Sequence, residues 1–295
     1  MASVDWQRPP KSLASVFCHI YSLNVLISVV IITRNEEANI ARTLNSVRSL
    51  VQDGRGEVII VDDGSTDRTR EIANSLGAKV YCESWKGYAA QKNSAIEKAQ
   101  GEWILSLDGD EELEPPLADE IGRVIDDDGG SEEARVRANS TSPVGYWMPR
   151  KNHFLGRWIK HGGFWPDPKL RLFRKCAGRF EDRAVHEDVK IKNGITRSFH
   201  GAILHHSYPT LSDYVRHMNE YSTLGAQMAV DKGYKGFSFV DIVLRPAFTF
   251  FYNYFFRLGF LDGREGLQLH IYHAVYVSWK YAKVWELYRQ STDRA

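Results

Sequence analysis

The chain of 295 residues contains little cysteine and carries almost no net charge. Its three cysteines, Cys18, Cys82 and Cys176, are too few for the disulfide framework of a small secreted protein. The 38 Lys and Arg side chains nearly balance the 37 Asp and Glu side chains, which argues against a broad basic surface for nucleic acid. We therefore expect a protein of the reducing cytoplasm that does not bind nucleic acid.

A long, uninterrupted apolar run is also absent. The most apolar N-terminal stretch, 13–32, contains His19, Ser22 and Asn24, and no small-residue cleavage site follows it. We therefore expect neither a signal peptide nor a membrane span there. Only 26–33 is expected to be structured, as a buried strand, because it is short and rich in β-branched residues. Residues 1–25 are then an N-terminal extension.

The balanced charge hides two segregated segments. Residues 108–133 hold twelve acidic side chains and one basic one, whereas residues 150–183 hold ten basic and three acidic ones. Such segments are often solvated faces of opposite sign. They also suit a site that must hold both a cation and a polyanion, and both interpretations stay open at this point.

Strand and helix patterns alternate through the first half of the chain. Apolar strands are expected at 26–33, 57–61 and 103–107, with helical periodicity between them. This alternation predicts an α/β fold with a mostly parallel sheet flanked by helices. Ligands of such sheets bind at the carboxyl ends of the strands, and acidic clusters follow the strands there, at 62–63 and at 108–110.

These acidic clusters indicate two kinds of chemistry. Asp108 and Asp110 stand two residues apart at a strand end, where both can reach a hard divalent cation that also binds phosphate oxygens. Asp62 and Asp63 can accept hydrogen bonds from a uracil N–H group or from ribose hydroxyls. The alternative for this second pair is a simple turn followed by a helix cap at Ser65 or Thr66, which explains the serine but not two adjacent acids.

Four colinear motifs within 26–125 resemble the family 2 glycosyltransferases with a GT-A fold. They are Thr33-Arg34-Asn35-Glu36-Glu37, VDDGSTD at 61–67, Gln91-Lys92-Asn93 after Gly87, and GEWILSLDGDEEL at 101–113. Further motifs are similar to the lipopolysaccharide-core branch that contains β-1,4-glucosyltransferases: GFWPDPKLRLFRK at 163–175, RAVHEDV at 183–189, His205-His206, and GFLDGREG at 259–266.

The resemblance implies an inverting enzyme that moves glucose or another hexose from a UDP-sugar to a saccharide acceptor in lipopolysaccharide core or a related cell-envelope glycan. It also implies a divalent metal, Mg²⁺ or Mn²⁺. The residues that match the donor site are Thr33, Asp62, Asp63, Lys92 and Asp108, and those that match the metal site are Asp110, Asp108 and His205. Many members carry Arg where this chain has Lys92, which is a point charge and not a bidentate fork.

A base must take a proton from the acceptor hydroxyl on the face opposite the leaving group. In the resembling family an acid C-terminal to the Asp-x-Asp motif has this role. Glu187 is the candidate here and Asp188 the second choice. The domains expected are a GT-A catalytic domain at 26–210, with a nucleotide half at 26–125 and an acceptor half at 145–210, and a helical region at 211–295.

The helical region is aromatic, with 14 Phe, Tyr and Trp residues among the 43 from Pro246 to Tyr288. A membrane span over 237–260 would contain Asp241, Arg245 and Pro246, so an interfacial helix is favoured. This predicts peripheral attachment to the cytoplasmic face of the inner membrane. The alternative is that these aromatic side chains pack within the protein.

Three other functions remain to be weighed. A polyprenyl-phosphate glycosyltransferase would use the same donor site and a lipid phosphate acceptor. A non-catalytic nucleotide-sugar-binding protein is disfavoured because the acids of 108–110 and 187–188 are both retained. A nucleotidyltransferase is disfavoured because 33–37 is acidic and lacks the glycines of a phosphate-binding loop.

Overall fold

A computed structural model describes residues 25–129, 142–181 and 188–292. The expected extension and Glu187 lie outside the described residues, apart from residue 25. Within these ranges the central sheet has seven strands, in the order β12 (Thr196–Ser198), β6 (Gly145–Met148), β9 (Lys169–Arg174), β4 (Trp103–Asp108), β1 (Ile27–Thr33), β2 (Gly56–Asp62) and β3 (Lys79–Cys82). The α/β class and its mostly parallel sheet are as expected.

The four strands from β4 to β3 run parallel, and β1 lies between β4 and β2. Their β-branched side chains are buried on both faces, which suits a sheet that is covered by helices on both sides. The strands expected at 26–33, 57–61 and 103–107 are confirmed to within a residue at each end. β9 interrupts the parallel order because it pairs antiparallel with both β4 and β6.

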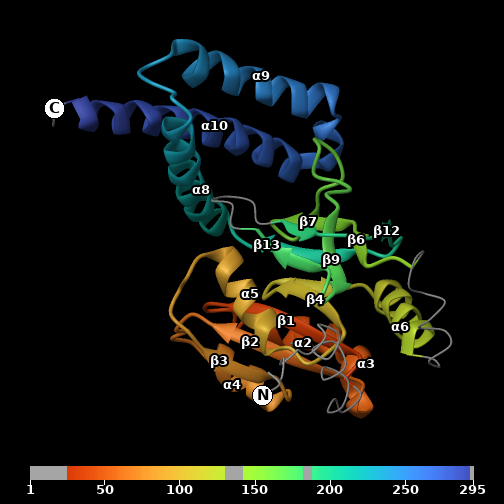
Figure 1. The fold of residues 1–295 in the computed structure, drawn as a ribbon. Coiled ribbons are helices and arrows are strands. Elements are labelled where there is room, and N and C mark those ends of the chain that lie inside the picture. The colour runs from red at the N-terminus through yellow and green to blue at the C-terminus, as the bar shows by residue number, and fades with distance from the viewer. Residues whose placement is uncertain (1–24, 130–141, 182–187, 293–295) are drawn as a thin grey trace, which may run out of the picture.

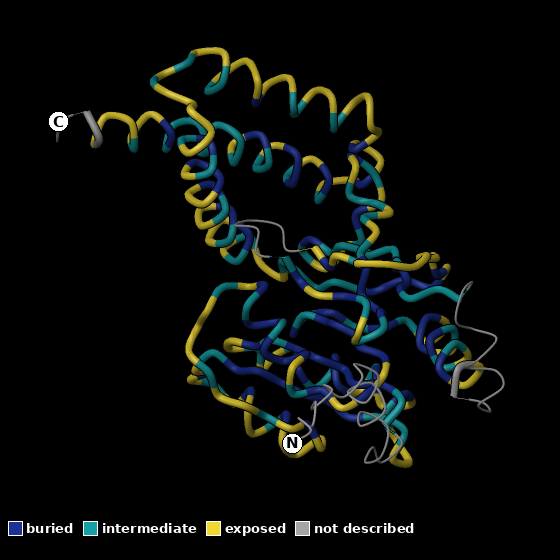
Figure 2. Tube along the Cα trace, viewed as in Figure 1, coloured by how far each residue is buried: buried dark blue, intermediate teal, exposed yellow. Residues whose placement is uncertain are grey.

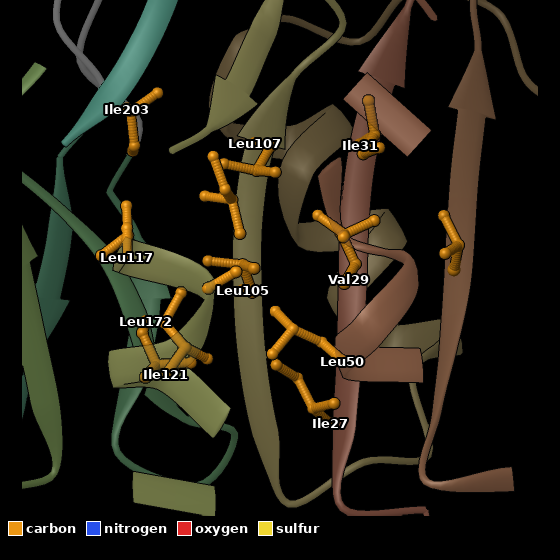
Figure 3. Packing of buried hydrophobic residues seen from close by; sticks show 14 of the residues in the cluster. Ile27, Val29, Ile31, Leu50, Leu105, Leu107, Leu117, Ile121, Leu172 and Ile203 are labelled. Carbon is orange, nitrogen blue, oxygen red and sulfur yellow. The ribbon is translucent and has the colours of Figure 1, made fainter. Parts of the chain in front are cut away.

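Helices cover both faces of the sheet. On one face α2 (Ile40–Ser46), α3 (Arg48–Val51) and α6 (Pro115–Gly129) pack on β1 and β4, where Figure 3 shows Val29, Leu50 and Leu105 in one apolar layer. On the other face α5 (Tyr88–Lys98) packs with the hairpin of β10 (Gly178–Phe180) and β11 (Val189–Ile191). Helix α4 (Thr69–Ser75) follows β2 and contributes to the first layer.

A second sheet lies beside the carboxyl ends of the parallel strands. Its order is β5 (Glu111–Leu113), β13 (Ile203–Tyr208), β7 (Arg150–Phe154) and β8 (Arg157–Trp158). β5 follows β4 after a tight turn, so the acidic segment 108–113 passes directly from the first sheet into the second. The second sheet therefore brings residues from the later part of the chain to the acidic turn.

The C-terminal region is helical, as expected. It comprises α8 (Leu211–Asp231), the π-helical turn η3 (Val240–Leu244), α9 (Arg245–Phe251), a second π-helical turn η4 (Tyr252–Phe256), η5 (Gly259–Asp262) and α10 (Gly263–Thr292). A third apolar cluster, which includes Phe154, Tyr214 and Leu269, joins this region to the second sheet. Figure 1 shows α9 alongside α10, on the side away from β1–β3. None of the described helices has the length and apolar character needed to cross a membrane.

Candidate active site

Three strand ends define the candidate site. Thr33 ends β1 and pairs in register with Asp62 at the end of β2, while Ile32 pairs with Asp108 at the end of β4. The two acidic clusters that the sequence places after separate strands therefore meet at one edge of the sheet. This is the edge at which parallel α/β sheets bind their ligands.

Asp62 and Asp63 differ in exposure and in contacts. Asp62 is fully buried, and its carboxylate accepts hydrogen bonds from the Thr33 hydroxyl at 2.9 Å and from the backbone N–H and hydroxyl of Ser65. It thereby holds the loops after β1 and β2 together. Asp63 is partly exposed and its Oδ2 lies 3.0 Å from Nη1 of Arg34. Of the two, Asp63 is the carboxylate that is accessible to solvent.

Asp108 lies between two buried cations. Its Oδ1 is 2.8 Å from Nζ of Lys92 on α5, and its Oδ2 is 2.6 Å from Nη2 of Arg171 on β9. Burial alone would raise the pKa of Asp108, but Arg171 and Lys92 outweigh burial and hold that pKa well below its usual range. A metal ion or ribose hydroxyl at Asp108 must therefore compete with these two cations.

Glu111 stabilises the turn at 108–110 from inside the protein. This side chain is fully buried, and its Oε2 accepts a hydrogen bond from the backbone N–H of Asp108 at 3.1 Å. Its Oε1 binds Nη2 of Arg171 at 2.6 Å and Nη1 of Arg150 at 3.0 Å. Two arginines from the basic segment 150–183 therefore bind buried acids of the segment 108–133. These two arginines therefore pair with carboxylates inside the protein and do not belong to a solvated face, whereas binding of a cation and a polyanion stays a prediction.

Asp110 faces an imidazole. Its Oδ2 lies 3.3 Å from Nε2 of His205 on β13. Burial opposes ionisation of Asp110, but when the His205 ring is protonated its charge and its hydrogen bond to the carboxylate outweigh burial and lower the pKa of the carboxyl group. The structure therefore brings together two of the residues that the sequence assigned to a metal.

The donor set near Asp110 fits a divalent cation that also binds substrate. No group of three or more His, Cys, Asp or Glu side chains suited to a metal occurs among the described residues. The protein thus offers Asp110 and His205, with Asp108 next to them, and leaves several coordination positions open. Mg²⁺ and similar ions bind in this way, through one or two protein ligands together with phosphate oxygens.

Glu36 is a site residue to which the sequence pattern assigned no role. A Cβ atom at Gly109 would lie only 2.8 Å from Cγ of Glu36, so the glycine lets Glu36 pack directly against the acidic turn. Burial, together with the nearby charges of Asp110 and Asp108, raises the pKa of Glu36 to about 7. The glycine between two aspartates and the glutamate in 33–37 were visible in the sequence, but their contact depends on the fold.

Helix α8 adds aromatic and imidazole rings beside Asp110. Tyr208 ends β13, and its ring lies 5.5 Å from that of His217 on α8, which stacks on Tyr221 at 4.2 Å. Burial raises the pKa of Tyr208 and the charge of Asp110 raises it further, which places this ring near the acidic turn. Rings at an acidic edge can pack on the faces of a sugar. No sequence pattern indicated His217, because it lies far along the chain from the acidic motifs.

The candidate base is not placed by the described residues. Glu187 lies outside them. Asp188 is described and exposed, just before β11, and its carbonyl oxygen accepts a hydrogen bond from the backbone N–H of Glu181 at 3.2 Å. The assignment of the base therefore stays a prediction.

Comparison with known proteins agrees with this geometry. The model of the family described as glycosyl transferase family 2 matches residues 28–182. The chain is 32% identical over 276 residues to an uncharacterized glycosyltransferase of Rickettsia typhi, which covers 90% of this chain and 89% of that protein. It is 28% identical over 243 residues to the lipopolysaccharide core biosynthesis glycosyltransferase LpsC of Rhizobium meliloti, with 80% and 82% covered.

A solved structure shares the fold. It is a mannosyltransferase from Pyrobaculum calidifontis, in complex with GDP-Man and Mn²⁺, that superposes with a TM-score of 0.51 at 14% sequence identity. The superposition covers 88% of this chain and 86% of that one. At this identity the likeness concerns the fold, which is the GT-A fold expected from the motifs.

Proposed function

The chain belongs to glycosyl transferase family 2 and is a glycosyltransferase, and we propose that it moves glucose or another hexose from a UDP-sugar to a saccharide acceptor, with inversion. The acceptor belongs to lipopolysaccharide core or a related cell-envelope glycan. The similarity to LpsC, which is named for lipopolysaccharide core biosynthesis, supports this class of acceptor.

The observation that carries the proposal is the meeting of carboxylates and buried cations at one sheet edge. Asp108 contacts both Lys92 and Arg171, and Asp110 follows it by two residues. A sugar diphosphate is a polyanion that Lys92 and Arg171 can bind in exchange for part of their contact with Asp108. A cation at Asp110 would offset the remaining negative charge.

We assign the nucleoside end of the donor to the neighbouring strand. Asp63 is the accessible acid, and it would accept a hydrogen bond from the uracil N–H group or a ribose hydroxyl. Thr33 and Asp62 hydrogen bond to each other and shape the loop on which Asp63 stands. Lys92 would contact the diphosphate as a point charge, with the Arg171 guanidinium next to it.

Asp110 and His205 are the proposed metal ligands, and Asp108 is the proposed third ligand, which would bind in exchange for one of its contacts with Lys92 and Arg171. The proposed ion is Mg²⁺ or Mn²⁺, and when bound it would supply Lewis acidity toward the departing diphosphate. The protein residues then have separate tasks. Lys92 and Arg171 bind the donor charge, while Glu111 holds the backbone of the Asp108 turn in place.

We propose Glu187 as the general base, with Asp188 as the second candidate. The base takes a proton from the acceptor hydroxyl while that oxygen attacks the sugar carbon from the face opposite the diphosphate. Such proton transfer contributes roughly 10²–10⁴-fold to enzymatic rates.

We assign a separate role to each half of the catalytic domain and to the helical region. Residues 26–125 bind the nucleotide, 145–210 bind the acceptor, and the helical region 211–295 attaches the protein to the cytoplasmic face of the inner membrane. Exposed apolar side chains of α9 and η4 support the last assignment, with Phe248 68% and Phe256 79% exposed. Figure 2 shows this helix exposed along most of its length.

A polyprenyl-phosphate glycosyltransferase is the second candidate, because the same exposed helix suits a lipid acceptor. Product analysis separates the two. Purified protein with a labelled UDP-hexose and Mn²⁺ is given either a core oligosaccharide or a polyprenyl phosphate, and the expected product is a glycosylated oligosaccharide. Label found only in the lipid phosphate would favour the second candidate. Nucleotide-sugar binding without any turnover would instead indicate a non-catalytic binding protein.

A further inference from the structure

Asn152 on β7 lies behind His205 and contacts three groups. Its Oδ1 is 2.7 Å from Nδ1 of His205. Its Nδ2 donates hydrogen bonds to Oδ2 of Asp167 at 2.9 Å and to the carbonyl oxygen of Phe164 at 3.3 Å. The amide thus joins the imidazole to a carboxylate on a loop of the acceptor half.

These contacts fix the orientation of the amide. Asp167 is ionised because Arg150 and Lys169 lie 2.8 Å and 3.1 Å from its oxygens, and burial does not outweigh them, so its pKa falls to about 2. An ionised carboxylate and a backbone carbonyl only accept hydrogen bonds. The NH₂ end of Asn152 must therefore face them, and its oxygen must face His205.

The orientation of the amide determines the tautomer of the imidazole. An amide oxygen only accepts, so the proton of a neutral His205 ring must reside on Nδ1. The hydroxyl of Ser207, 2.7 Å from the same nitrogen, can rotate to accept from it as well. Nε2 is then left with its lone pair directed at Asp110, 3.3 Å away. In the neutral ring two acceptor atoms therefore face each other, and this position suits either a divalent cation or the second proton of an imidazolium.

We infer that Asn152, oriented by Asp167, is a positioning residue that holds His205 with an unprotonated Nε2 toward Asp110, ready to bind a divalent cation. The inference deepens the proposed function, since it rests on the proposed metal site. In metal sites generally, hydrogen-bond partners of this kind fix the orientation of the histidine that binds the metal.

A chain of ion pairs connects Asp167 to Asp108, the first aspartate of the Asp-x-Asp motif. Arg150 binds both Asp167 and Glu111, and Arg171 joins Glu111 to Asp108. The side chains that position His205 and those that hold Asp108 therefore form one connected set of ion pairs. They stand on β5, β7 and β9 and on the loop that carries Asp167, so both ends of the Asp-x-Asp turn share one support.

The decisive experiment reads the tautomer without any metal. Protein labelled with ¹⁵N-histidine is freed of metal and studied by two-bond ¹H–¹⁵N NMR at about pH 8.5, well above the ordinary imidazole pKa of about 6.5. His205→Gln identifies the signals of this ring. The expected result is an Nδ1–H tautomer in the wild type and a shift to the Nε2–H tautomer in Asn152→Ala, because the freed ring then donates to Asp110.

A second variant covers the case in which Asn152→Ala does not fold. Asp167→Asn keeps a residue that tolerates the positive φ of 40° found there, but it removes the acceptor-only partner of Asn152. A mixture of tautomers is expected. An Nε2–H tautomer in the wild type, or an Nδ1–H tautomer unchanged in a folded variant, would overturn the inference.

Metal affinity gives an independent measure. Mn²⁺ binding in the presence of UDP, followed by electron paramagnetic resonance, should weaken roughly 10–100-fold in Asn152→Ala. Asn219→Ala on α8, whose side-chain oxygen accepts a hydrogen bond from Lys283 on α10, is the matched control and should bind Mn²⁺ like the wild type. Absence of Mn²⁺ binding in the wild type would contradict the proposed metal-dependent function, whereas the tautomer experiment judges the role of Asn152 separately because it uses no metal.

Discussion

The two aspartates of the 108–110 turn have different neighbours, which gives them different sensitivity to substitution. Asp108 contacts two cations, whereas Asp110 contacts His205. We predict that Asp110→Asn abolishes transfer and sharply weakens metal-dependent UDP binding while the fold survives, because Asn keeps the size of the side chain but lacks its charge. Calorimetric titration of UDP with and without Mn²⁺ measures this. Unchanged activity with full metal dependence would contradict the assignment.

The base is tested by a pair of neighbouring variants. Glu187→Gln should leave donor binding nearly intact and lower kcat by roughly 10²–10⁴-fold, because only proton transfer is lost. Asp188→Asn is the matched comparison and should have a smaller effect. Steady-state kinetics together with UDP affinity distinguish the two. A large loss in Asp188→Asn alone would transfer the role to Asp188.

Glu36 should make the stability of the protein depend on pH. Its pKa is raised from 4.5 to about 7, so between these values the folded protein binds more protons than the unfolded chain. The contribution of Glu36 to the free energy of unfolding therefore falls as pH rises through this range. Glu36→Gln lacks this contribution, and it should gain stability relative to the wild type from about pH 4.5 to about pH 7.

Urea denaturation of both proteins at several pH values measures the difference. The lowest pH of the series is kept above the usual pKa range of the other carboxyl groups, so that their own titration contributes little to the measured difference. A difference between the two proteins that does not change with pH would show that Glu36 ionises normally in the folded state.

Contacts that follow from the parallel order of the strands could be predicted, whereas those that depend on the antiparallel strand β9 could not. The acids at 62–63 and 108–110 follow strands, so their meeting at one edge follows from the parallel order. Arg171 lies 63 residues after Asp108 and reaches it because β9 pairs antiparallel with β4. No local pattern predicts that pairing, so Arg171 could be described only as a member of a basic segment.

At the scale of secondary-structure elements, the α9–η4 helix has an exposed face that should bind membranes. We predict that Phe248→Glu with Phe256→Glu reduces sedimentation with anionic vesicles several-fold and changes the free energy of unfolding little. Both side chains are mostly exposed, so little packing is lost, whereas a charge disfavours the lipid interface. Ile195→Glu, an exposed apolar position outside this helix, is the control.

Two outcomes would contradict peripheral attachment. Wild-type protein that stays fully soluble at low salt and does not sediment with vesicles would indicate that the helix has no membrane role. Wild-type protein that resists carbonate and high salt, and that only detergent extracts, would indicate insertion of the helix into the bilayer.

The elements themselves were largely predictable. The strands of the first half are short and β-branched, and α8 and α10 were expected from the helical character of the segment after 210. The exposure of the α9–η4 aromatics was not predictable, because a packed helix and a surface helix of the same composition have the same pattern. Exposure depends on which face α10 covers, and that is a property of the assembled fold.

At the scale of the whole molecule, binding of the donor nucleotide should raise the free energy of unfolding. A ligand that binds only the folded state adds RT ln(1 + [L]/Kd), which is about 2.7 kcal/mol at 100 times Kd. We predict that UDP with Mn²⁺ raises Tm, that UDP with a chelator raises it much less, and that Asp110→Asn loses the difference. Thermal denaturation with each ligand set measures this. Equal shifts with and without metal would contradict metal-assisted binding.

The antiparallel strand β9 has a consequence for synthesis on the ribosome. Glu111 belongs to the first part of the chain to emerge, yet both of its arginine partners, Arg150 and Arg171, are translated later. Until then, burying this carboxylate would be costly, because a buried charge without a partner is strongly destabilising. The nascent segment 26–125 therefore lacks both arginine partners of Glu111, and the same segment produced as a fragment would lack them permanently. Evolutionary exchange of acceptor halves between relatives would likewise have to preserve these two arginines.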